Sequence, residues 1–176
     1  MKLRGISFYL SLFCFPISFL AFINILYASY FDYFLSIDTY FTALLISFFI
    51  GGVLWYFGKN SSKNLDFIEQ LILIISAYFL TSILIAIPFY LSNYQVTLLN
   101  SIFESVSGLT GTGFSIFKNI KYIDPTLILW RSSSQWIGGL FFLIILIIIF
   151  SNKSFNYKMT NLTFSGDSNF KSKENI

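Results

Sequence analysis

Positions 107–115, "SGLTGTGFS", concentrate glycine, threonine and serine in a sequence that is otherwise strongly apolar. Glycine permits backbone angles that other residues avoid, because it lacks a Cβ atom. Threonine adds a hydroxyl oxygen beside the backbone carbonyls. Carbonyl oxygens that all point one way can replace the hydration shell of a cation. The chemistry that this segment offers is therefore cation coordination by backbone oxygens.

A short helix is predicted directly before this segment. Residues 96–109, "VTLLNSIFESVSGL", repeat apolar side chains at helical spacing. A helix of about 12 residues is roughly 18 Å long, which is about half of a hydrocarbon core of roughly 30 Å. Half-helix, Gly/Thr loop and return to the surface match the plan of a selectivity filter. The residues alone equally allow an extracellular amphipathic helix with a flexible loop packed on the bundle.

Four longer segments are apolar enough to cross a bilayer, and only 11% of all residues are charged. Lys2 and Arg4 would suit a signal peptide, but the apolar stretch after them is too long, so we expect it to be retained. The predicted fold is all-α, with four transmembrane helices and one re-entrant half-helix and filter loop between the third and fourth. The predicted spans are Ile6–Tyr30, Tyr40–Phe57, Phe67–Leu91 and Leu127–Phe150, the last following Pro125 at the helix start.

The basic residues predict the orientation of these spans. If all four cross, eight basic residues share the side of both termini and three lie opposite. The first connection, "FDYFLSID", is acidic, and the polar tail after Phe150 reads as a cytoplasmic linker or disordered end. Both termini are therefore expected in the cytoplasm. The eight are Lys2, Arg4, Lys59, Lys63, Lys153, Lys158, Lys171 and Lys173, and the three are Lys118, Lys121 and Arg131.

The composition argues against several other functions. The sequence has no histidine and a single cysteine, Cys14, which we interpret as a small packing residue. No nucleophile, base or metal cluster is visible, so neither an enzyme nor a bound cofactor is expected. The basic residues form no stripe, so no nucleic-acid partner is expected. The lipid bilayer is the expected surrounding.

Several polar residues near the Gly/Thr loop allow two interpretations each. Glu104 either contacts an ion or fixes the half-helix by bonding loop amides, and we favour the second. Arg131 either extends to the outer headgroups or forms a salt bridge with Glu104 or Asp124. Gln135 and Trp136 either bond the outer backbone of the loop or mark a membrane interface. Gly138 and Gly139 are expected to allow close helix packing.

Two phrases resemble a known family of cation uptake proteins. "FESVSGLTGTGFS" at 103–115, followed by "LWRSSSQWIGGL" at 129–140, resembles the Trk/Ktr/HKT superfamily, and most closely the bacterial Trk-type membrane subunit. The resemblance covers about residues 65–150. It implies that residues 1–64 are an extra pair of transmembrane helices, that 65–150 is the first of four span–pore–span repeats, and that 151–176 is a linker or tail.

The resemblance also implies a function, potassium uptake across the bacterial cytoplasmic membrane. The expected partners are the remaining pore repeats, a second copy in a homodimer and a cytosolic nucleotide-binding regulatory subunit. Because a filter must surround its ion, we expect these 176 residues alone to conduct no potassium. The alternative function is a non-conducting structural or regulatory membrane protein.

The resemblance assigns the filter backbone to the Gly/Thr segment. Glu104, Arg131, Gln135 and Trp136 would support it. Potassium is expected to contact the carbonyls of Thr112 and Gly113. Gly111 stands where the family more often has threonine, which leaves the register between the two glycines open, and we favour Gly113 as the filter glycine. The expected filter residues are Thr110, Gly111, Thr112, Gly113 and Phe114.

Overall fold

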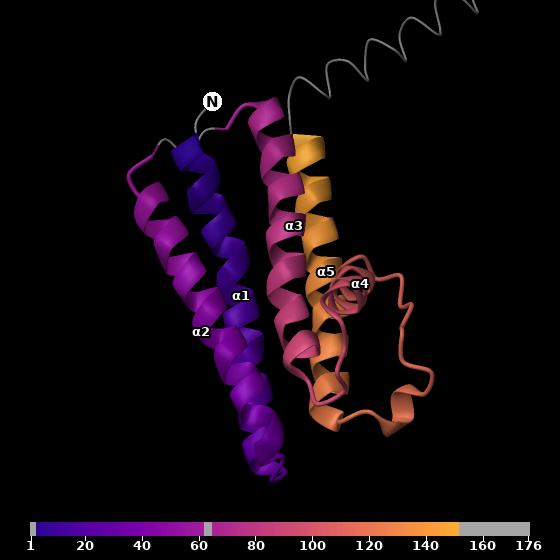
Figure 1. Cartoon of the computed structure of the whole chain (residues 1–176). Helices are drawn as coiled ribbons and strands as arrows, with labels where there is room; N and C mark the ends of the chain where they lie inside the picture. Colours follow the sequence, from indigo (N-terminus) through magenta and orange to yellow (C-terminus); the bar gives the residue numbers. More distant parts are fainter. Residues whose placement is uncertain (1–2, 62–64, 152–176) are drawn as a thin grey trace, which may run out of the picture. The chain divides into compact units, whose positions relative to one another are not determined.

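The computed structural model describes residues 3–61 and 65–151, and within these ranges the regular structure is helical. Four of the helices are long and apolar enough to cross a membrane, which confirms that part of the predicted fold. The chain divides into two compact units, Met1–Leu140 and Phe141–Ile176. The elements are α1 (Leu3–Tyr30), α2 (Phe34–Gly58), α3 (Phe67–Leu91), α4 (Leu98–Leu109), a 3₁₀ turn (Ile120–Tyr122) and α5 (Pro125–Ser151) (Figure 1).

The helix bounds agree with the sequence except at the start of α2. This helix begins at Phe34, six residues before the predicted Tyr40, so the first connection is short and Asp38 lies inside the helix. Asp38 lies in the second turn of α2 and is exposed, so its carboxylate stays in contact with solvent and does not prevent a helix there. The predicted tail, residues 151–176, lies outside the described residues apart from Ser151, the last residue of α5.

Small residues allow α1 and α2 to lie side by side (Figure 1). The Ser18 and Ser47 hydroxyl oxygens are 2.8 Å apart across the contact. A Cβ atom added at Gly51 would lie 3.1 Å from the Cβ of Cys14, which is fully buried. A Cβ atom at Gly58 would collide with the backbone of Phe8. Close backbone approach through small residues is the usual way in which helices associate within lipid.

Trp130 connects the first part of α5 to α2 and α3. Its indole N–H donates to the carbonyl of Ile85 at 3.0 Å, and its ring centroid lies 5.8 Å from that of Tyr40. The Tyr40 hydroxyl in turn lies 3.2 Å from the hydroxyl of Thr126. These contacts hold the first part of α5 against α2 and α3.

The short helix α4 buries its polar residues and exposes its apolar ones. Its 12 residues match the predicted length. Glu104 is fully buried, whereas Leu99 is 76% exposed and Phe103 is 45% exposed. A helix on a protein surface in water has the opposite pattern. The remaining buried residues of α4 are small or polar apart from Leu109: Ser101, Ser105, Ser107 and Gly108.

The carboxyl end of α4 packs closely on the middle of α5. A Cβ atom at Gly108 would collide with the Ser134 hydroxyl, and one at Gly138 would collide with the carbonyl of Leu109. A Cβ atom at Gly139 would meet open space, so close packing uses only one of these two neighbouring glycines. Gly138 follows Pro125 by 138 − 125 = 13 residues, which is about 20 Å along the helix. The loop after α4 therefore begins well away from the start of α5.

Candidate functional site

The Gly/Thr loop folds back onto the carboxyl end of α4. The amides of Thr110 and Gly111 donate to the carbonyls of Val106 and Gly108 at 2.9 and 3.0 Å. The amide of Gly113 and the hydroxyl of Thr112 both approach the carbonyl of Ser107, at 3.4 and 3.3 Å. The last carbonyls of a helix lack partners within the helix, and here the loop supplies them.

Both glycines of the loop adopt left-handed backbone angles. Gly111 has φ +70° and Gly113 has φ +77°, where a side chain would be strained. This conformation turns the amides toward α4. Within the described residues the carbonyls of Thr110, Gly111 and Thr112 receive no hydrogen bond. Together these three exposed residues present carbonyl oxygens that remain available to a ligand.

Glu104 holds the far end of the same loop from inside α4. Its Oε1 atom accepts hydrogen bonds from the Ser115 hydroxyl and the Ile116 amide, both at 2.6 Å. Its Oε2 atom accepts from the guanidinium of Arg131, with which it forms a salt bridge. Both carboxylate oxygens are therefore paired, as a fully buried charge requires.

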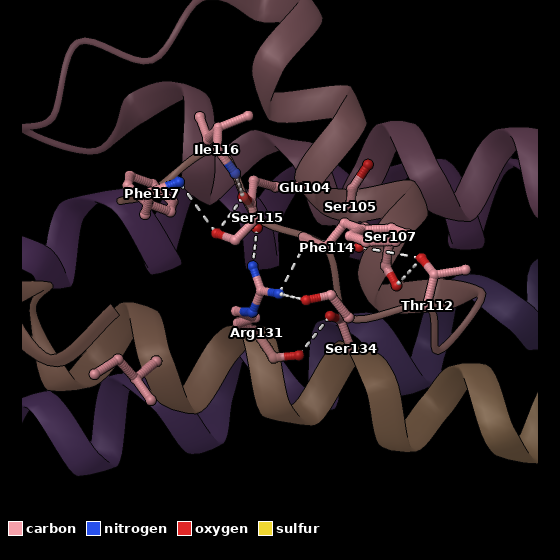
Figure 2. Close-up of polar contacts among 12 residues, drawn as sticks. Glu104, Ser105, Ser107, Thr112, Phe114, Ser115, Ile116, Phe117, Arg131 and Ser134 are labelled. Carbon is pink, nitrogen blue, oxygen red and sulfur yellow. Dashed lines mark hydrogen bonds and ion pairs between the residues drawn. The ribbon is translucent and has the colours of Figure 1, made fainter. Parts of the chain in front are cut away.

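Arg131 joins α4, the loop and α5 through one guanidinium group. Figure 2 shows it between Glu104 and the end of the loop. Its Nη2 atom donates to the carbonyls of Gly113 and Phe114 at 2.8 and 3.1 Å. The carbonyl of Phe114 also accepts from the Ser107 hydroxyl at 2.6 Å. The planar guanidinium group suits several neighbouring acceptors, since it presents its donors in fixed directions.

The other predicted supporting residues lie elsewhere. Of the two acids considered as partners of Arg131, Asp124 instead accepts from the amide and hydroxyl of Thr126 at the start of α5. The Trp136 side chain is 71% exposed. A Cβ atom at Gly113 would lie 4.0 Å from the Gln135 amide nitrogen. Neither Gln135 nor Trp136 forms a hydrogen bond to the loop among the described residues.

Three serines belong to the site although the sequence did not single them out. Ser107 bonds both Thr112 and the carbonyl of Phe114, and Ser115 bonds Glu104. The Ser134 hydroxyl donates to the carbonyl of Arg131 at 2.7 Å and faces Gly108. The sequence offered one signal for them, the position of Ser107 one helical turn after Glu104. Serine is otherwise too common in loops and at helix ends to indicate a site.

Over the described residues these features define an all-helical membrane protein with four helices long and apolar enough to cross a bilayer, in which a buried ion pair holds a loop of exposed carbonyls beside α5. Within the described ranges, no three acidic, cysteine or histidine residues are grouped as in a metal site. The chain belongs to the TrkH family of cation transport proteins, which it matches over residues 36–171. The family description names transport rather than catalysis.

Individual relatives are potassium uptake proteins by name. The Trk system potassium uptake protein TrkG of Escherichia coli (strain K12) is 32% identical over 106 residues, which are 60% of this chain and 22% of that protein. TrkI of Halomonas elongata is 42% identical over 55 residues, 31% of this chain and 11% of that protein. TrkH of Salmonella typhimurium is 27% identical over 113 residues, 64% and 23% respectively. The chain thus spans less than a quarter of these relatives. No solved structure matches it significantly.

Proposed function

We propose that this chain supplies one re-entrant pore element to a potassium uptake protein of the cytoplasmic membrane. In this proposal α4 enters the bilayer from the outer side and ends near its middle. The loop from Thr110 to Ser115 then lines the ion path. Irregular backbone is tolerated at that depth only where it lines a water-filled cavity or is buried in protein. The family match and the potassium uptake relatives support this substrate.

The observation that carries the proposal is the reversed polarity of α4. An extracellular surface helix would expose Glu104 and bury Leu99, whereas here the acid is fully buried and the leucine is exposed. Exposed apolar side chains on this helix suit lipid or further protein and do not suit water. The contact of Leu109 with Gly138 agrees with an end at membrane depth. Both features disfavour the surface-loop interpretation that the sequence left open.

The proposed ion contacts are the carbonyls of Thr110, Gly111 and Thr112. The sequence suggested Thr112 and Gly113, but the Gly113 carbonyl accepts a hydrogen bond from Arg131. A potassium ion on that oxygen would lie close to a guanidinium, and like charges repel. We therefore assign Gly113 the role of turning the chain, and Gly113 and Phe114 the role of anchoring the loop to Arg131. The α4 carboxyl end adds a partial negative charge near the ion path.

Glu104 and Arg131 act as positioning residues in this proposal. Each has its charge paired, so the pair as a whole adds little net charge beside the ion. Its contribution is to hold the loop in one conformation through the contacts to Gly113, Phe114, Ser115 and Ile116. A filter that keeps its carbonyls in place does not have to reorganise when an ion arrives.

The proposal includes the surroundings that the family resemblance implies. Residues 1–64 would be an additional helix pair, and residues 65–150 would form one pore repeat. Further repeats, from the same or a companion chain, would complete the ring of carbonyls. Both termini would be cytoplasmic, where a nucleotide-binding subunit could regulate a homodimeric transporter.

A hybrid protein tests the proposal. Residues 65–140 of this chain would replace the corresponding segment of Escherichia coli TrkG, in a strain without other potassium uptake. The hybrid should restore growth at low potassium and rubidium uptake. The same hybrid with Arg131→Met should not, while Gly139→Ala, which meets open space, should behave as the parent hybrid. A hybrid that reaches the membrane in normal amount and transports no ion would refute the proposal.

A further inference from the structure

A small polar cavity lies apart from the Gly/Thr loop, between the start of α2, the end of α3 and the start of α5. Its volume is about 60 Å³. We propose that this cavity binds a monovalent alkali cation, independently of the proposed ion path. The residues on which the argument rests are Ser36, Tyr40, Ser92, Tyr94, Asp124 and Thr126, all of which line the cavity.

The serine hydroxyls of the cavity have already used their protons. Ser36 donates to the carbonyl of Tyr33 at 2.9 Å, and Ser92 donates to the carbonyl of Phe89 at 2.7 Å. A carbonyl oxygen can only accept, so the direction of both bonds is certain. Because a hydroxyl has a single proton, these two oxygens can offer only lone pairs to another group.

The same is true of Tyr40 and Thr126. Asp124 Oδ1 accepts from the Thr126 hydroxyl at 2.9 Å, which uses the threonine proton. The contact of 3.2 Å between Tyr40 and Thr126 then requires Tyr40 to be the donor. Tyr94 accepts from the Asp124 amide at 2.6 Å and keeps its own proton. Four of the five hydroxyl groups named here therefore present acceptors, which suits a cation. Thr39 and Asn93 also line the cavity, and each can add an acceptor oxygen as well as protons.

The charge of the cavity favours a cation as well. Asp124 Oδ2 receives no hydrogen bond from the described residues, so one carboxylate oxygen is available. The carboxyl end of α3, which reaches the cavity through Pro88 and Ser92, adds a partial negative charge. The starts of α2 and α5 oppose this with their free amides, about half a unit of positive charge each. The Asp124 carboxylate and the end of α3 together carry about one and a half negative units, so the balance stays negative.

The size and the single carboxylate indicate which kind of cation fits. A water needs about 10–15 Å³ of such space, so the cavity has room for one ion with a few waters. Divalent ions in proteins are usually held by several carboxylates. One carboxylate with neutral hydroxyl oxygens suits a monovalent ion, either sodium or potassium.

The experiment measures the thermal unfolding midpoint of the full chain in mild detergent. Sodium chloride or potassium chloride replaces choline chloride at constant ionic strength. A ligand that binds the folded state raises the midpoint in a saturable way. Asp124→Asn keeps an oxygen that can cap α5 but removes the charge. It should raise the half-saturating cation concentration at least tenfold. Tyr40→Phe, which removes one hydroxyl oxygen, should raise this concentration several-fold.

Asp66→Asn is the matched control, because Asp66 also caps a helix, α3, and does not line the cavity. It should respond to cations like the unmodified chain. No saturable rise over choline, or equal losses with Asp124→Asn and Asp66→Asn, would show that the cavity holds water only and would overturn the proposal. Arg131→Met, which disturbs the Gly/Thr loop, separates the two sites. In this variant the rise in unfolding midpoint that depends on Asp124 should persist, even if potassium no longer binds the loop.

Discussion

Arg131 and Glu104 form a buried ion pair whose guanidinium also binds the carbonyls of Gly113 and Phe114. One side chain of α5 thus fixes both the acid of α4 and the end of the loop. Removing it would leave a fully buried carboxylate without its counter-ion and two carbonyls without one of their donors. The consequences can be measured separately for charge and for hydrogen bonding.

Arg131→Met should lower the free energy of unfolding by about 3–5 kcal/mol, the usual cost of leaving one charge of a buried pair alone. Arg131→Lys should recover only part of it, because an ammonium group cannot reproduce the guanidinium fork. Denaturant unfolding in detergent would measure both. In the double variant with Glu104→Gln the loss should be smaller than the sum of the two single losses. Additive losses would show that the two residues do not act as a pair.

Gly138→Ala should destabilise the packing of α4 on α5, whereas Gly139→Ala should be close to neutral. A methyl group at 138 would collide with the carbonyl of Leu109, and one at 139 would meet open space. Forced overpacking costs about 1–3 kcal/mol. Thermal unfolding of the two variants under identical conditions is the comparison. Equal stability of the two would mean that α4 does not approach α5 at Gly138.

The sequence predicted the helices well because their signals are local. The length of apolar runs located four spans, and the helical period located α4. The contacts of the site were less accessible. Glu104 and Arg131 are 131 − 104 = 27 positions apart, and only the packing of α4 on α5 decides that they meet. The start of α2 differs from the prediction because the acidic connection containing Asp38 indicates a loop, whereas an exposed acid is tolerated inside a helix.

A second pair of glycines tests the contact between α1 and α2. Gly58→Ala places a methyl group against the backbone of Phe8, while Gly52→Ala meets no atom within 4 Å. Only the first should lower the unfolding midpoint, since backbone atoms cannot move aside as a flexible side chain can. A change of similar size in both variants would point to a general effect of alanine in α2.

Cysteine labelling tests the orientation of the loop. Cys14, which is fully buried, would be replaced by alanine, and cysteine introduced singly at Thr112 and at Ser61. An impermeant thiol reagent should reach position 112 only from the outer side and position 61 only from the cytoplasmic side. Potassium should slow labelling at 112 in the assembled transporter. Labelling of both positions from one side would overturn the predicted topology.

The last prediction concerns the two glycines of the loop. Gly111 and Gly113 have nearly the same left-handed angle, so a side chain should cost each about 1–2 kcal/mol of backbone strain. Strain alone therefore predicts equal effects of Gly111→Ser and Gly113→Ser. The surroundings differ, however, because a Cβ atom at 111 meets open space whereas one at 113 lies 4.0 Å from Gln135.

Gly113 also carries the carbonyl that Arg131 binds, so displacing it releases the anchor of the loop. We therefore expect Gly113→Ser to reduce rubidium uptake in the TrkG hybrid more than Gly111→Ser does. Equal defects in the presence of Arg131 would mean that strain alone sets the requirement for glycine. A larger defect at 111 would show that uptake depends more on the ion contacts around Gly111 than on the anchor at Gly113.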